Sequence, residues 1–114
     1  MPAAAAPERI DSVAHALADG TRRGLLRLVR DDERAAGDLA AAFPNISRPA
    51  VSQHLRVLKE ARLVKAAAEG TRNFYSVDSR GLAAVHRYFD ALWERALGDF
   101  KAVAEASYQR KRRS

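Results

Sequence analysis

Six side chains between residues 48 and 59 have the types and spacing of a surface that contacts nucleic acid. All carry hydrogen-bond donors: Arg48, Ser52, Gln53, His54, Arg56 and Lys59. In the major groove arginine pairs well with guanine and glutamine with adenine, while flanking arginine and lysine side chains bind phosphates. Because residues three and four apart share one side of a helix, Arg48, Ser52 and Arg56 fall together. The pattern predicts a helix that reads duplex DNA.

The element that must carry these side chains is a helix that begins at Ser47 and ends near Ala61. The Ser47 hydroxyl is suited to cap the helix, and Pro49 is tolerated in a first turn, where its missing N–H costs nothing. The opposite side holds apolar residues at i, i+4 and i+7: Val51, Leu55 and Leu58. For His54 two roles stay open, as a donor to DNA or as a hydrogen-bonded group within the fold.

A short hairpin follows this helix. We expect strands at 63–67 and 72–77, with Glu69 and Gly70 in the turn. Thr71 is placed to contact a phosphate, and Arg72 and Asn73 to reach the backbone or the minor groove. The expected DNA-binding residues of helix and hairpin are Ser47, Arg48, Pro49, Ser52, Gln53, His54, Arg56, Lys59, Thr71, Arg72 and Asn73.

Three helices are expected before the reading helix, because apolar residues recur there at helical spacing. They cover residues 8–18, 21–30 and 36–43. Asp19 is suited to cap the second, and the acidic run Asp31–Glu33 is a polar connection. Arg22 and Arg23 lie at a helix N-terminus, where the helix dipole disfavours cations. We therefore expect them to be held within the chain by the acidic run rather than by a DNA phosphate.

A long last helix, from Asp78 or Ser79 to about Gln109, carries a continuous apolar stripe. About 30 residues at 1.5 Å each span roughly 45 Å, whereas a compact chain of this size has a radius of gyration near 13 Å. The helix is therefore too long to bury its stripe against its own domain. We expect a second copy of the chain to cover it; the alternative is a helix broken at Gly98 that folds back.

The net charge of +6 on 114 residues is concentrated in two segments. Residues 47–80 carry seven basic and three acidic side chains, and 110–114 carry four basic and no acidic ones, while 1–46 and 81–109 each have a net of −1. The chain has no cysteine, which excludes disulfides and thiol chemistry, and no apolar run of the roughly 18 residues that a membrane helix needs. We expect a flexible arm at 1–7, one domain at 8–109 and a basic tail at 110–114, in a cytoplasmic protein.

Several separate segments resemble the ArsR/SmtB family of bacterial winged-helix repressors. They are Ala16–Arg23, Ser47–Leu58, Gly70–Arg72, Phe74–Ser76 and Gly81–Leu82, in the family's order. The resemblance implies a mainly α fold, a winged helix-turn-helix of five helices and a two-stranded wing. It also implies a homodimer that binds a pseudo-palindromic operator with recognition helices about 34 Å apart. The dimer interface expected from the first and last helices is Ile10, Val13, Leu17, Leu82, Val85, Phe89, Leu92, Trp93, Ala96 and Phe100.

The chain departs from the metal sensors of that family. Where they place cysteines, at the start of the third helix, this sequence has Ala35 and Gly37, which carry no donor atoms. On the last helix His86 and Asp90 are four apart, the spacing of an ordinary surface pair. We therefore expect no metal and no cofactor. The turn at 44–46 is one residue longer than is usual in the family.

The sequence thus predicts a regulator of transcription, a repressor that binds double-stranded DNA as a homodimer in a bacterial nucleoid. Two alternatives stay open: a dimeric module that docks a protein on its long last helix, and a sensor released by a ligand other than a thiol-bound metal. No membrane partner is expected, and any small-molecule effector is unknown. An enzyme is disfavoured because no nucleophile–base pair, carboxylate pair or phosphate loop is apparent.

Overall fold

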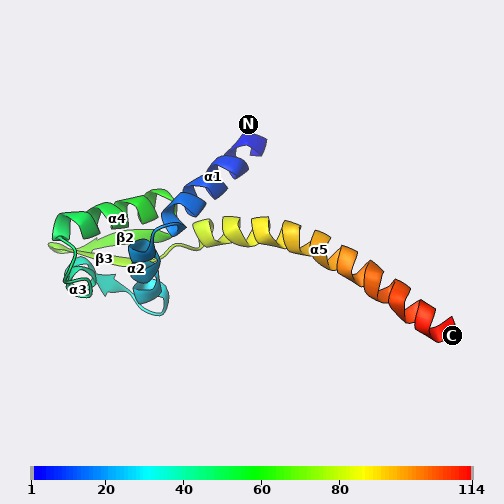
Figure 1. Ribbon diagram of the computed structural model, residues 1–114. Helices are drawn as coiled ribbons and strands as arrows, with labels where there is room; N and C mark the ends of the chain where they lie inside the picture. The colour runs from blue at the N-terminus through cyan, green and yellow to red at the C-terminus, as the bar shows by residue number, and fades with distance from the viewer. Residues whose placement is uncertain (1, 114) are drawn as a thin grey trace.

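Five helices and a small sheet make up the part of the chain that the computed structural model describes, residues 2–113, with side chains described at 9–108 and 110 (Figure 1). The elements are α1 (Pro2–Leu17), α2 (Gly20–Arg30), β1 (Arg34–Ala35), α3 (Ala36–Ala41), α4 (Arg48–Glu60), β2 (Val64–Glu69), β3 (Arg72–Val77) and α5 (Ser79–Arg113). Helix α1 begins within the predicted arm, and α5 runs into the predicted tail. The side chains of that arm, and those of the tail apart from Arg110, lie outside the described residues. The division into arm, domain and tail stays a prediction.

Two side-chain caps set where α2 and α4 begin. The Asp19 carboxylate accepts hydrogen bonds from the backbone N–H groups of Thr21 (2.8 Å) and Arg22 (3.1 Å). The bond from the Arg22 N–H is the main cause that lowers the pKa of Asp19. The Ser47 hydroxyl accepts from the Ala50 N–H at 3.2 Å. Both caps are those that the sequence predicted, since each satisfies N–H groups that a helix start leaves unpaired.

The sheet has three strands rather than the predicted two, in the order β1–β3–β2 with antiparallel pairs. Strand β1 pairs Arg34 with Tyr75 and Ala35 with Phe74. The wing, which is the hairpin of β2 and β3, is thereby joined to the start of α3. A two-residue strand has no periodicity, and for this reason the sequence pattern missed it. Strand β2 also runs further than expected, to Glu69, because its alanines pair with the β-forming residues of β3.

The core lies where α1, α2, α3, α4 and β2 meet. Its fully buried residues come from every one of these elements: Val13, Ala16, Leu25, Val29, Leu39, Val51, Leu55, Leu58, Leu63 and Val64. The predicted inner face of α4 is therefore confirmed. Val13 corrects one prediction, because it is 0% exposed within its own chain and is not available to contact a second copy. Its side chain fills the core because α1 packs there against α2 and α4.

Helix α5 leaves this domain and extends away from it to the C-terminus (Figure 1). It continues through Gly98, so the alternative of a break at that residue is wrong. The molecule measures 72 × 36 × 22 Å, and its radius of gyration is 20.1 Å, against the roughly 13 Å of a compact domain of this length. Among the described residues no helix has the length and apolar character needed to span a membrane.

Candidate nucleic-acid interface

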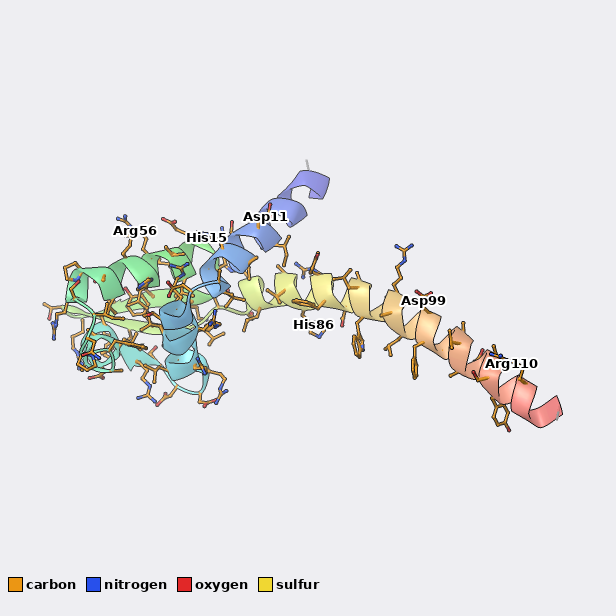
Figure 2. The ribbon with its side chains drawn as sticks, viewed as in Figure 1. Asp11, His15, Arg56, His86, Asp99 and Arg110 are labelled. Carbon is orange, nitrogen blue, oxygen red and sulfur yellow. The ribbon has the colours of Figure 1, made fainter. Side chains whose placement is uncertain are left out.

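The outward face of α4 presents a row of polar side chains to solvent. Ser47, Arg48, Pro49, Ser52, Gln53, Arg56 and Lys59 are all exposed, as predicted for a reading surface. In the described part of the chain, no hydrogen bond or ion pair engages the side chains of Arg48, Gln53 or Arg56. Their donors are therefore available to base edges and phosphates. Arg56 stands out from α4 in Figure 2.

His54 differs from the rest of this row because it is only half-exposed and has a partner within the chain. Its Nδ1 lies 3.3 Å from Nη1 of Arg22. Since a guanidinium only donates, Nδ1 is the acceptor, and the neutral ring carries its proton on Nε2. Of the two roles left open by the sequence, the geometry favours the hydrogen-bonded group inside the helix-turn-helix, where it links α2 to α4.

Arg22 and Arg23 do not pair with the acidic run, which corrects that prediction. Arg22 donates from Nε to the carbonyl of Ala16 (2.8 Å) and from Nη2 to that of His15 (3.0 Å). Arg23 donates from Nη1 to the carbonyl of Leu17 at 2.7 Å. The last carbonyls of a helix are unpaired and carry its partial negative charge, so they suit guanidinium groups. These bonds tie the end of α1 to the start of α2.

The wing ends in a tight turn between Glu69 and Arg72, which are cross-strand partners. Gly70 has φ +61°, the positive value that the first position of a type II′ turn requires. Thr71, Arg72 and Asn73 are exposed at this tip, and their contacts with DNA stay a prediction. The Arg72 guanidinium lies 5.1 Å from the centre of the Phe74 ring, a cation–π contact that holds it at the tip.

A polar groove of about 490 Å³ runs beside the C-terminal half of α4 and continues the cationic row toward β2. Arg62 and Lys65 line it together with Arg56 and Lys59. Sequence reasoning did not assign Arg62 or Lys65 to the site, although both contributed to the positive charge counted at 47–80. Only the packing of β2 against α4 brings the two groups beside Arg56.

A compact junction joins the end of α4 to the start of α5. Arg62 has φ +61°, and its carbonyl accepts a hydrogen bond of 2.8 Å from the Gly81 N–H. A Cβ at Gly81 would lie 2.5 Å from that oxygen, so only glycine fits. The Leu63 carbonyl accepts from the Asp78 N–H at 2.9 Å. The end of α4 and the start of α5 are therefore joined directly by backbone hydrogen bonds.

Asp78, next to this junction, is a buried carboxylate with a charged partner. It is 5% exposed and accepts from Arg80 Nη2 at 2.6 Å and from the Arg80 backbone N–H at 3.0 Å. The hydrogen bonds from the Arg80 side chain are the main cause that lowers the Asp78 pKa to about 2, against the opposing effect of burial. Asp78 thus satisfies the first turn of α5, as the sequence predicted for Asp78 or Ser79.

The face of α5 that was predicted to contact a second copy is open along its length. Phe89 is 60% exposed, Trp93 62% and Phe100 70%, and Leu82, Leu92 and Ala96 are exposed with them. Ile10, Leu17 and Val85 are half-buried at the base of the helix. Apart from Val13, the predicted interface residues are therefore at least partly accessible to a second copy.

The histidine of α5 forms a surface pair. His86 Nδ1 lies 3.3 Å from Asp90 Oδ2, one turn away, with both side chains more than half exposed. Within the described residues no group of three or more His, Cys, Asp and Glu side chains lies close enough to hold a metal ion. Figure 2 shows His86 far from His15, which is on α1.

The sequence and the fold of this chain are similar to those of known proteins. A helix-turn-helix domain model matches residues 17–66. The HTH-type transcriptional regulator Rv2034 of Mycobacterium tuberculosis is 46% identical over 96 residues, which cover 84% of this chain and 89% of that protein. The transcriptional repressor SdpR of Bacillus subtilis is 37% identical over 70 residues, 61% of this chain and 77% of the repressor.

A solved structure resembles most of this fold. It is the homodimeric winged helix-turn-helix DNA-binding domain of Mb0332 from Mycobacterium bovis, a possible ArsR-family transcriptional regulator. That structure superposes with a TM-score of 0.64 and 31% sequence identity over 82% of this chain and 86% of that one.

Proposed function

Because the chain belongs to the ArsR/SmtB-type family of helix-turn-helix transcriptional regulators, we propose that it is a homodimeric repressor that binds a pseudo-palindromic operator. Helix α4 enters the major groove of each half-site, and the wing follows the backbone beside it. Arg48 and Gln53 contact base edges. Arg56, Lys59 and Thr71 contact phosphates, and Arg72 and Asn73 reach the backbone or the minor groove.

The observation that carries the proposal is the two-sidedness of α4. Val51, Leu55 and Leu58 are at most 2% exposed and fix the helix to the core. The opposite face has donors without partners among the described residues, at the spacing that a major groove accepts. Arg62 and Lys65 extend the proposed phosphate contacts along the same side. His54 supports α4 from behind by its contact with Arg22 and is not assigned to bases.

Dimerisation is supported by the apolar face of α5. Large aromatic side chains that are more than half exposed are costly to leave in water, and a two-fold partner helix covers them. The Mb0332 domain, described as homodimeric, supports the same assembly here. A two-fold dimer in turn accounts for a two-fold symmetric operator, with α4 helices about 34 Å apart.

The proposed role is binding rather than catalysis, in keeping with the transcriptional regulators that the chain resembles. A protein that binds chromosomal DNA works in the cytoplasm at the nucleoid, and the proposal places this chain there. It needs no metal and no cofactor. The basic residues at 110–114 add a sequence-independent attraction to phosphate.

Selection of bound sequences from a random DNA pool, followed by footprinting, tests the proposal. We expect two inverted half-sites whose centres lie about 10 base pairs apart, or a multiple of one helical turn. Light scattering of the complex should give two chains on each duplex. Enrichment of no sequence, or of a single half-site bound by one chain, would contradict the proposal.

A further inference from the structure

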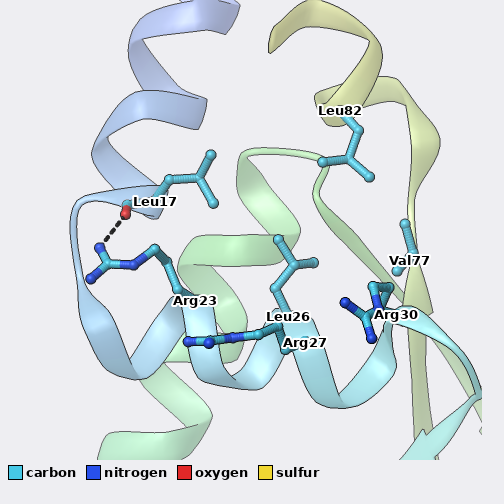
Figure 3. A pocket seen from close by; sticks show the side chains of 7 residues that line it. All are labelled: Leu17, Arg23, Leu26, Arg27, Arg30, Val77 and Leu82. Atoms are coloured by element: carbon cyan, nitrogen blue, oxygen red, sulfur yellow. Dashed lines mark hydrogen bonds between the residues drawn. The ribbon is translucent and has the colours of Figure 1, made fainter. Parts of the chain in front are cut away.

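A pocket of about 420 Å³ is lined by residues of α1, α2, β3 and α5. Its floor is apolar and consists of Leu17, Leu26, Val77 and Leu82. Figure 3 shows the leucines from α1, α2 and α5 directed into one space. The volume is within the roughly 300–1,000 Å³ of pockets that hold small organic molecules. The operator contacts proposed above do not use this pocket, although Leu17 and Leu82 of its floor are also among the predicted dimer-interface residues.

One side of the pocket is cationic. Arg23, Arg27 and Arg30 of α2 line it, and no acidic side chain does. Arg30 is paired with Asp31, at 3.1 Å, and Arg23 uses Nη1 to bind the Leu17 carbonyl. Arg27 has no hydrogen bond or ion pair among the described residues, and its whole guanidinium is available. An apolar floor with an open guanidinium at its edge is complementary to one kind of molecule, an organic anion with an apolar body.

We propose that this pocket binds an amphipathic carboxylate, with its hydrocarbon chain on the leucine floor and its carboxylate on Arg27. A guanidinium binds a carboxylate with two parallel hydrogen bonds, and the spare N–H groups of Arg23 are at the same edge. The apolar floor supplies binding by burial of the chain, which a small inorganic anion lacks. Both halves of the ligand are therefore required.

The pocket also lies between the two working parts of the molecule. Leu82 follows Gly81, which is bonded to the end of α4, and α2 contacts α4 through Arg22 and His54. A ligand that bridges α2 and α5 therefore favours one arrangement of the reading helix relative to the dimerisation helix. We expect its binding to change operator affinity by about 5- to 150-fold, the usual range of coupling between two sites. This consequence, unlike the site itself, rests on the proposed function.

Calorimetric titration of the full-length dimer without DNA tests the site. Decanoate should bind once per protomer, whereas butyrate, which has no long chain, and decyltrimethylammonium, which has the wrong charge, should not. Arg27→Gln should weaken decanoate binding about tenfold or more, because one charge-assisted contact is lost. Arg95→Gln, an exposed arginine of α5 outside the pocket, is the matched control and should bind as the parent does. Melting temperatures check that both variants are folded.

Equal affinity of the Arg27→Gln variant, or equal binding of the cationic detergent, would overturn the proposed site. Absence of any binding to the parent dimer would overturn it too. A separate arm measures operator affinity with and without decanoate. Binding without a change in operator affinity would refute the regulatory consequence and leave the site. Failure to bind any operator would refute the proposed function, and the calorimetric result would still decide the pocket.

Discussion

The outer face of α4 and the apolar face of α5 are both exposed, and among the described residues both lack a partner, yet they differ in what exposure costs. Arg48 and Gln53 are well solvated, and exposed side chains of this kind are normal on any protein. Phe100 at 70% exposure and Trp93 at 62% keep apolar surface in water, at about 25 cal/mol for each Å². The apolar face of α5 is therefore unfavourable in water, whereas the polar face of α4 is not.

The physical reason to expect a binding partner therefore differs between the two faces. A second copy on α5 follows from the unfavourable hydration of one contiguous stripe. DNA on α4 follows from a pattern, since donors at groove-compatible spacing stand opposite a buried stripe that fixes their direction. Five substitutions, grouped in four experiments, test this distinction, and the experiments are ordered by the size of the expected effect.

Trp93→Glu should have the largest effect, because it places a charge in the middle of the apolar stripe. We expect a monomer in light scattering and a loss of about 100-fold or more in affinity for a two-half-site operator, since the second half-site no longer benefits from linkage. Ala91→Glu, which adds the same side chain to an exposed position on the opposite side of α5, is the control and should stay dimeric. A dimeric Trp93→Glu protein would remove α5 from the interface.

Arg48→Ala and Gln53→Ala should each cost about 1–3 kcal/mol at the cognate operator and relax specificity at one base position. The physical reason is the loss of the bidentate contact to a base edge that we propose for each of these side chains. Binding to cognate and scrambled duplexes, measured at one salt concentration, checks this. If both variants discriminate as well as the parent, α4 positions the protein on DNA but does not read it.

Asp78→Asn tests the junction between α4 and α5, where the Asp78 carboxylate binds Arg80. The folded-state pKa of Asp78 is about 2, below its ordinary 3.8, so the ionised group stabilises the fold above about pH 4. This stabilisation, at most about 2 kcal/mol since Arg80 is half-exposed, is lost as the pH falls from about 4 to 2. Urea unfolding should show the Asn variant less stable at pH 7 and the difference shrinking at acid pH. A constant difference would exclude the Arg80 interaction as its cause.

Lys59→Ala should have the smallest effect. Loss of the proposed phosphate contact should weaken binding to all sequences alike and lower the slope of log affinity against log salt by about one. Affinity for cognate and random duplexes between 50 and 200 mM salt, values in the range where such slopes are resolved, gives the measurement. A change confined to the cognate sequence would instead assign Lys59 to base contact.

Most of the fold was predictable from the sequence, because its signals are local. The caps at Asp19 and Ser47, the inner stripe of α4 and the long final helix all follow from spacing along one element. Strand β1 was not predictable in this way, since two residues become a strand only when β3 lies beside them. The partners of Arg22 and Arg23 depend likewise on how α1 ends against α2.

The same difference between local signals and contacts across the fold applies to the candidate site. Arg48, Ser52 and Arg56 were placed correctly on one exposed face by helical periodicity alone. Their contacts with DNA stay a prediction. Arg62, Lys65 and the pocket around Arg27 were not identified, because each depends on elements that are distant in sequence and adjacent only in the folded chain. The burial of Val13 was missed for the same reason: a stripe on α1 does not reveal which residue faces inward.

The bond between Gly81 and Arg62 has a consequence for how strictly the operator is measured. In the proposed dimer each α4 helix lies about 17 Å from the two-fold axis, half of the roughly 34 Å between half-sites. A tilt of about 10° at the junction would displace the far end of α4, about 20 Å away for 13 residues, by about 3 Å, close to the rise of one base pair. The spacing between the two half-sites that the dimer accepts therefore depends on this angle, and a change of about 10° corresponds to a spacing that differs by about one base pair.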